Sequence, residues 1–198
     1  MLNFIGKTIK ENLRIWLILF LVMLLFVAVG VVYYFISPAS GEEIANKLIS
    51  EFKERGILTE KDLLKKTLLI FLNNAKAVGL AALLGISGII PVFIVVGNGF
   101  LIGLFSAYVY VNSNASLMSL LLALLPHGII EIPAVLLACS GGLRWFLLVV
   151  QRRDMSLKMR IFKGFRLAFY SFMVSLPMLL LAAFIEVYIT PIIVKMSL

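Results

Sequence analysis

Long apolar runs, separated by short polar connections, dominate the pattern along this chain. Ile15 to Ile36 contains no charged residue, and from Ala77 to Ile130 no residue carries a fixed charge. A membrane-spanning helix needs about 20 apolar residues, because the hydrocarbon core is about 30 Å thick and each residue rises about 1.5 Å. The first run therefore predicts one span and the second predicts two. The turn within the second run is expected at Gly85, Gly88 or Pro91, where helices are readily interrupted.

These runs predict an all-α, polytopic helical membrane bundle with about five transmembrane helices. The chain is expected to form a single membrane domain over residues 1–198, with spans at residues 15–36, 66–90, 91–111, 126–151 and 167–193. Leu117 to Leu125 is too short to cross a bilayer alone, and it ends at Pro126. It is therefore expected to be a half-helix, either re-entrant or interfacial, with Pro126 in the first turn of the next span.

The polar segment between the first two spans predicts a helical hairpin over residues 40–65. Ser40 with Glu43, and Thr59 with Asp62, have the spacing of a capping box, which marks the first turn of a helix. Two short helices are therefore expected. The whole segment from Ser37 to Lys66 has six acidic and six basic residues, and this balance is expected for a segment translocated outward.

The composition excludes an ordinary soluble domain. Hydrophobic residues make up 62% of the chain and charged residues 14%, and the mean hydropathy is +1.09. The formal net charge of +8 comes mainly from basic residues that flank spans, at Lys7, Lys10 and Arg14 and in a basic loop at residues 152–166. This distribution favours contact with anionic lipid over nucleic acid. It predicts a multi-pass plasma-membrane protein with its N-terminus and basic loop cytoplasmic and its C-terminus outside.

Polar residues within the spans are the candidates for function, because a polar group in hydrocarbon must be compensated by a partner or by water. They are Asn73, Asn74, Lys76, Asn98, His127, Glu131 and Glu186. His127 and Glu131 lie four residues apart and so share one helix face. The pair could relay protons or bind a cation. The alternative is structural, with the pair holding Asn73, Asn74 or Lys76 of a neighbouring helix.

Small residues recur at helical spacing and predict faces where helices pack closely, since association in lipid depends on close approach. On the predicted second and third spans these glycines are Gly79, Gly85, Gly88, Gly99 and Gly103.

Signatures of known catalytic and cofactor sites are missing from the sequence. The single histidine excludes an H-E-x-x-H zinc site, and no G-x-S-x-G motif occurs. The chain is therefore expected not to be an enzyme, to carry no catalytic residues and to use no cofactor. His127 and Glu131 are too few as ligands to name a metal.

Several short motifs, in order along the chain, resemble the stage II sporulation protein M family of prokaryotic integral membrane proteins. They are Phe71-Leu72-Asn73-Asn74, the glycine-rich stretch from Gly79 to Gly88, Asn98-Gly99 with Gly103, Pro126-His127-Gly128-Ile129-Ile130-Glu131 with Ala134, and Gly141-Gly142-Leu143-Arg144. The resemblance implies a membrane protein with a polar bundle centre. In sporulating bacteria the family's namesake resembles a scaffold that recruits peptidoglycan-remodelling partners, whereas many relatives occur in organisms that make no spores.

These observations favour a membrane scaffold or assembly protein that recruits membrane or cell-envelope proteins through the hairpin or the basic loop. The sequence leaves open whether it also forms a homo-oligomer. The competing hypothesis is a small channel or an ion- or proton-coupled transporter that uses the Asn, His and Glu residues.

Overall fold

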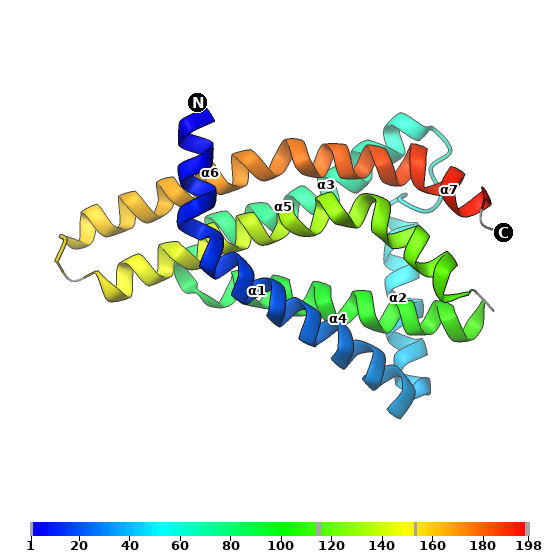
Figure 1. The fold of residues 1–198 in the computed structure, drawn as a ribbon. Coiled ribbons are helices and arrows are strands. Elements are labelled where there is room, and N and C mark those ends of the chain that lie inside the picture. Colours follow the sequence, from blue (N-terminus) through cyan, green and yellow to red (C-terminus); the bar gives the residue numbers. More distant parts are fainter. Residues whose placement is uncertain (1, 114–115, 153, 197–198) are drawn as a thin grey trace. The chain divides into compact units, whose positions relative to one another are not determined.

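The computed structural model describes residues 2–113, 116–152 and 154–196, with side chains described from Leu13 onward. These residues form helices and turns, and no β-strand occurs among them (Figure 1). The helices are α1 (Leu2–Ile36), α2 (Pro38–Glu54), α3 (Leu63–Leu83), α4 (Ile89–Asn112), α5 (Leu117–Gln151), α6 (Leu157–Phe184) and α7 (Thr190–Met196), with a 3₁₀ turn, η1 (Gly85–Ser87), and a π-helical turn, η2 (Ile185–Ile189).

Five helical segments within the described residues are long and apolar enough to cross a membrane. They are Leu13–Ile36, Leu63–Leu83, Ile89–Asn112, Leu117–Gln151 and Leu157–Met196. The predicted all-α polytopic architecture is confirmed.

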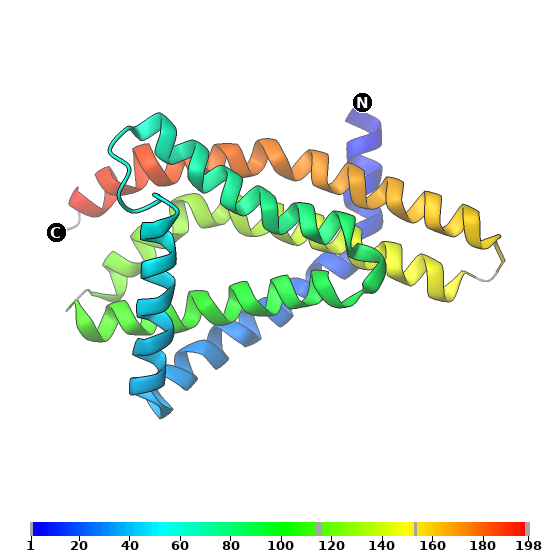
Figure 2. The same cartoon turned by 180° about the vertical axis from the view of Figure 1, so that it is seen from behind.

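The chain divides into two compact units, and the five long segments each contribute to both. The first unit contains Met1–Val22, Asn74–Val96 and Glu131–Leu179, and the second contains Met23–Asn73, Gly97–Ile130 and Leu180–Leu198. In the first unit α5 and α6 run side by side (Figures 1 and 2). In the second unit α2 turns back sharply from the end of α1 (Figure 2).

Helix α2 begins earlier than its predicted capping box. Pro38 occupies the first helical turn, where its missing N–H costs no hydrogen bond, and Ser37 is the N-cap residue. The Ser37 hydroxyl donates to Ser40 Oγ at 3.1 Å. Ser40 therefore lies inside the helix, and the break between α1 and α2 is a single residue.

The second short helix expected in the hairpin is instead the start of α3. Residues 55–59 form turns, in which Gly56 has a left-handed φ of 78°. The backbone N–H of Lys65 donates to Asp62 Oδ1 at 2.9 Å, so Asp62 caps α3 directly. The acidic residue of the predicted Thr59–Asp62 capping box thus makes the cap itself.

The turn between α3 and α4 lies where the glycines predicted an interruption. It consists of η1 followed by Gly88, which has a φ of 70°. A side chain at Gly88 would be strained by this φ and would also meet the Phe146 ring at 2.8 Å. Pro91 falls in the first turn of α4, so α4 begins two residues before the expected start of the third span.

Leu117 to Leu125 forms no separate half-helix, because α5 continues without interruption from Leu117 to Gln151. Pro126 and Pro133 both lie in its interior. Each removes one backbone hydrogen bond without ending the helix, as membrane helices tolerate where neighbouring groups compensate.

The last span contains a π-helical turn just before Pro191. Pro191 has no N–H, so it cannot complete the α-helical bond to the carbonyl of Val187. The N–H of Thr190, the residue before Pro191, bonds to the carbonyl of Ile185, five residues earlier. The turn that carries Glu186 is therefore one residue wider than an α-helical turn.

Candidate functional site

Asn74 and Glu131 are brought together in the first unit. The Asn74 amide, on α3, donates from Nδ2 to Glu131 Oε1, on α5, at 3.0 Å. Both side chains are half-buried. The Glu131 carboxylate, which lies within a predicted span, thus accepts a hydrogen bond directly from a neighbouring helix.

Asn73 has a different partner, although it precedes Asn74 directly. In the second unit, Arg55 Nη1 donates to Asn73 Oδ1 at 2.7 Å, and Arg55 also pairs with Glu51 Oε2 at 3.3 Å. Successive residues of a helix point about 100° apart, so they face different neighbours. Asn73 thus connects α3 to the end of α2.

His127 lies beside Glu186 in the second unit. A ring nitrogen of His127, on α5, and a carboxylate oxygen of Glu186, on η2, lie within 4.8 Å of each other. His127 Nδ1 is buried and has no hydrogen-bond partner among the described residues. Glu131 follows His127 by one turn of α5. The imidazole and the Glu186 carboxylate could share a proton or contribute two ligands to a cation, which is too few to identify a metal.

The two remaining polar candidates lie on separate helices. Asn98 is half-buried on α4 in the second unit. Lys76 is on α3 in the first unit, where its side chain is exposed.

The glycines of α4 mark a close crossing of α1 and α4 in the second unit. A Cβ atom at Gly99 would lie 2.6 Å from the carbonyl oxygen of Met23, and one at Gly103 would overlap the carbonyl oxygen of Val27. From the opposite side, a Cβ atom at Gly30 would overlap the carbonyl oxygen of Phe100. The backbones of the two helices therefore touch directly.

In the first unit the close contacts centre on α5. Gly142 lies against the carbonyl of Ala81 and against Gly85, so that a side chain at either glycine would meet backbone atoms. Gly79, in contrast, has ordinary clearance, since a Cβ atom there would come no closer than 3.7 Å to Phe172. Ser175, on α6, donates to the carbonyl of Ala134 at 2.7 Å. This hydrogen bond joins the buried part of α5 to α6.

One face of α2 is held in place and the other is exposed. On the held face, Gly41 packs against the Tyr34 ring, and Ala45 is buried. Tyr108, on α4, donates to Asn46 Oδ1 at 3.3 Å. The exposed residues of α2 include Glu42, Glu43, Asn46, Lys47, Ser50, Lys53 and Glu54. The helix therefore presents a charged surface on a fixed support.

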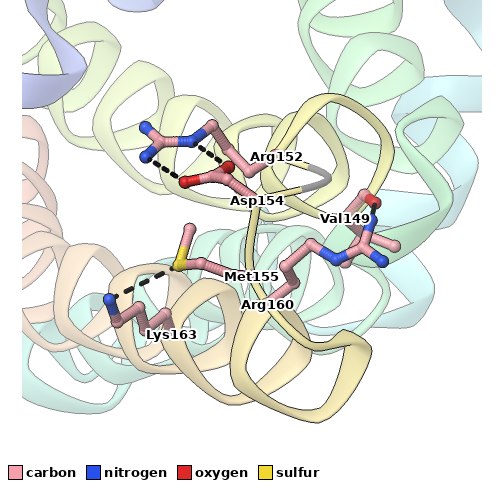
Figure 3. Close-up of polar contacts among 6 residues, drawn as sticks. All are labelled: Val149, Arg152, Asp154, Met155, Arg160 and Lys163. Atoms are coloured by element: carbon pink, nitrogen blue, oxygen red, sulfur yellow. Dashed lines mark hydrogen bonds and ion pairs between the residues drawn. The ribbon is translucent and has the colours of Figure 1, made fainter.

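The basic segment over residues 152–166 is also structured (Figure 3). Arg152 donates to both carboxylate oxygens of Asp154, at 3.0 Å each. These hydrogen bonds hold the pKa of the Asp154 carboxyl below its ordinary value. Arg160 donates to the carbonyl of Val149, and Lys163 Nζ lies 3.5 Å from Met155 Sδ. Arg153, also part of the predicted basic loop, lies outside the described residues.

Some participants in these contacts were not singled out from the sequence. Arg55 directly precedes Gly56, just after α2, and in the sequence it has the character of an ordinary solvent-exposed charge. Gly30 is the one glycine of the first apolar run, and its isolation on α1 could have indicated a contact face. Tyr34, which packs against Gly41 and accepts a hydrogen bond from Asn112 at 2.9 Å, gave no distinct signal among the aromatic residues.

Residues 3–191 match the family described as stage II sporulation protein M. Comparisons with curated proteins and with solved structures found no match.

Proposed function

Because the chain belongs to the stage II sporulation protein M family, we propose that it is an integral membrane scaffold that recruits other membrane or cell-envelope proteins. The proposed role is binding and assembly, with no catalytic step. The polar residues within the spans then serve mainly to fix the helices that carry the docking surfaces.

The observation that carries this proposal is the exposed charged face of α2. Its acidic and basic residues are interspersed, its opposite face packs against the Tyr34 ring, and Tyr108 bonds to the exposed Asn46. Arg55 fixes the end of the helix to Asn73. A charged surface held by several contacts on a short helix keeps its shape before a partner arrives, which lowers the ordering cost of binding.

The proposal can be tested by photocrosslinking in the native membrane. A photoreactive residue replacing Glu43 should give discrete cross-linked products, and the charge reversals Lys47→Glu and Lys53→Glu should weaken them. The same residue placed at Ala45, which is fully buried, is the matched control and should give none. If the products persist unchanged after both reversals, the α2 surface does not recruit the partner.

A transporter is the second candidate, because His127 Nδ1 is buried with no hydrogen-bond partner in the part of the chain that the structure describes, and a carboxylate oxygen of Glu186 lies within 4.8 Å of a ring nitrogen of His127. Under this hypothesis Glu186→Gln and Glu131→Gln should each keep the fold and abolish ion or proton flux in proteoliposomes. The scaffold hypothesis predicts no specific flux from the parent chain at matched folded amounts. Flux that depends on either carboxylate would displace the scaffold hypothesis.

We propose a topology with the N-terminus and the basic segment cytoplasmic, and with α2 and the C-terminus outside. This topology follows if each of the five candidate segments crosses the membrane once, and the basic residues favour the cytoplasm for residues 152–166. Single cysteines at Glu51 and Lys158 in a Cys139→Ala background should react with an impermeant reagent from opposite sides. Labelling of both from one side would contradict this arrangement.

A further inference from the structure

A lysine lies on an apolar exposed face of α3 in the first unit. Leu80 and Leu83 follow Lys76 by one and two turns. These leucines are 49% and 65% exposed, and Lys76 is exposed as well. We call these three residues the Lys76 face.

The sequence of α3 places Lys76 deep in the bilayer. Lys65 and Lys66 end the polar segment before this span, so they mark the membrane interface. The helix rises about 15 Å from Lys66 to Lys76, which is half the thickness of a hydrocarbon core of about 30 Å. The backbone of Lys76 therefore lies near the midplane, which is the depth at which an unpaired charge costs the most free energy.

The side chain cannot readily escape to the interface. A lysine stem has four methylene groups, which is too short to span half of the hydrocarbon core. In a helix the Cα–Cβ bond leans toward the N-terminus, so the stem of Lys76 starts out toward the N-terminal half of α3 and away from the end of the helix at Leu83.

The acidic side chains described in the first unit already have partners. Among the described side chains of the first unit, the acidic ones are Glu131 and Asp154. Glu131 accepts a hydrogen bond from Asn74, and Asp154 is paired with Arg152. Lys76 forms no ion pair with either of them. A second copy of the chain docked symmetrically on this face would bring two Lys76 side chains together, which is unfavourable for like charges.

We propose that the Lys76 face docks a transmembrane helix of another protein, one that carries a carboxylate at the depth of Lys76. The leucines supply the packing surface, and the carboxylate neutralises the ammonium group in a medium of low dielectric constant. This inference rests on the proposed scaffold function, because it names an intramembrane surface and the chemistry of the partner that fits it.

The test uses a synthetic single-span helix in place of the partner. The full-length chain, labelled at a cysteine replacing Glu54 in a Cys139→Ala background, is reconstituted in phosphatidylcholine vesicles at pH 8. Energy transfer is measured to leucine–alanine helices that carry one central Glu, one central Gln, or one Glu near an end. The central-Glu helix should associate at least threefold more strongly than the other two.

Substitutions on α3 identify the residue responsible. Lys76→Leu should abolish the preference for the central-Glu helix, and Lys76→Glu should transfer it to a helix with a central Lys. Lys66→Leu, the matched control on the same helix, should leave the preference intact. Gel filtration and circular dichroism establish that each variant is folded.

Three results would overturn the inference. The first is equal binding of the Glu and Gln helices by the folded parent chain, and the second is a preference that survives Lys76→Leu. The third is self-association of the parent chain that requires Lys76, since the occupant would then be a second copy. These results leave the scaffold proposal standing if the α2 reversals still weaken crosslinking. If those reversals have no effect but the Glu preference holds, only the α2 proposal fails.

Discussion

Two helix pairs, one in each unit, solve the same packing problem by different means. In the second unit, α1 and α4 meet through Gly30, Gly99 and Gly103, so that backbone lies directly on backbone. In the first unit, α5 and α6 combine close packing with a hydrogen bond from Ser175 to the carbonyl of Ala134. Lipid offers no hydrophobic drive between helices, so each pair must rely on shape, on hydrogen bonds or on both.

The contrast indicates how each contact responds to change. A backbone contact leaves no room, so the smallest added side chain must separate the helices. A hydrogen bond from a hydroxyl group can be removed with little change in the shape of the side chain. The free energy of unfolding then falls only by the contribution of that hydrogen bond. The α1–α4 crossing should therefore be intolerant of added volume, whereas loss of the Ser175 hydrogen bond should lower stability only slightly.

The largest effect is expected from Gly103→Ala. The new Cβ atom would overlap the carbonyl oxygen of Val27, and overpacking of this kind typically costs about 1–3 kcal/mol. Unfolding in mixed micelles with increasing dodecyl sulfate, followed by circular dichroism, measures the loss. Gly97→Ala on the same helix is the control, because a Cβ atom there would meet nothing within 4 Å. Equal stability of the two variants would contradict the close crossing.

A smaller effect is expected from Ser175→Ala. This change removes the bond to Ala134 together with a local bond to the carbonyl of Ser171, and interhelical bonds in membranes average about 0.6 kcal/mol. Ser106→Ala is the matched control, since its hydroxyl bonds to the carbonyl of Ile102 on its own helix. The same denaturation assay should show a greater loss for Ser175→Ala. The reverse order would argue against a stabilising α5–α6 bond.

Glu131→Gln should change stability less than Ser175→Ala. The glutamine carbonyl can still accept the hydrogen bond from Asn74, and the charge that lipid disfavours is removed. Glu131→Leu removes the acceptor and should be clearly less stable than Glu131→Gln in the same assay. If the two variants unfold together, the Asn74 bond contributes nothing measurable.

The smallest effect is expected outside the spans, at Glu60. Hydrogen bonds from Lys65 and from the backbone N–H of Asp62 lower the pKa of this carboxyl from its ordinary value of 4.5. A lowered pKa stabilises the fold above the ordinary value, and this stabilisation is lost as the pH falls through the folded-state pKa. Glu60→Gln should therefore reduce the loss of stability below pH 4.5. An identical pH profile for parent and variant would exclude this contribution.

The number of spans was predictable because apolar runs of this length have few alternatives, and the glycine turn was predictable because it interrupts such a run. The prediction of a half-helix before Pro126 was wrong, because the sequence does not show whether neighbouring groups compensate for the N–H that a proline lacks. The prediction of a second short helix in the hairpin was also wrong, because Asp62 caps α3 directly.

The candidate polar residues were recognisable by type and depth, but their pairing was not. Asn73 and Asn74 are neighbours in sequence with different partners, Arg55 and Glu131. Their directions depend on the rotation of α3, which hydrophobic periodicity defines poorly when all sides of a helix are apolar. The motif at Gly99 and Gly103 likewise marks a contact face on α4 without identifying α1 as its partner.

The π-helical turn at Ile185–Ile189 corresponds to a defined change in the coding sequence. It holds one residue more than the α-helical turn it replaces, so it corresponds to the insertion of a single codon. Removing one residue from it would rotate the following residues by about 100° relative to α6. Thr190, buried in the native chain, would then face a new direction. Single-residue insertions and deletions, more than substitutions, should therefore determine how this end of the chain evolves.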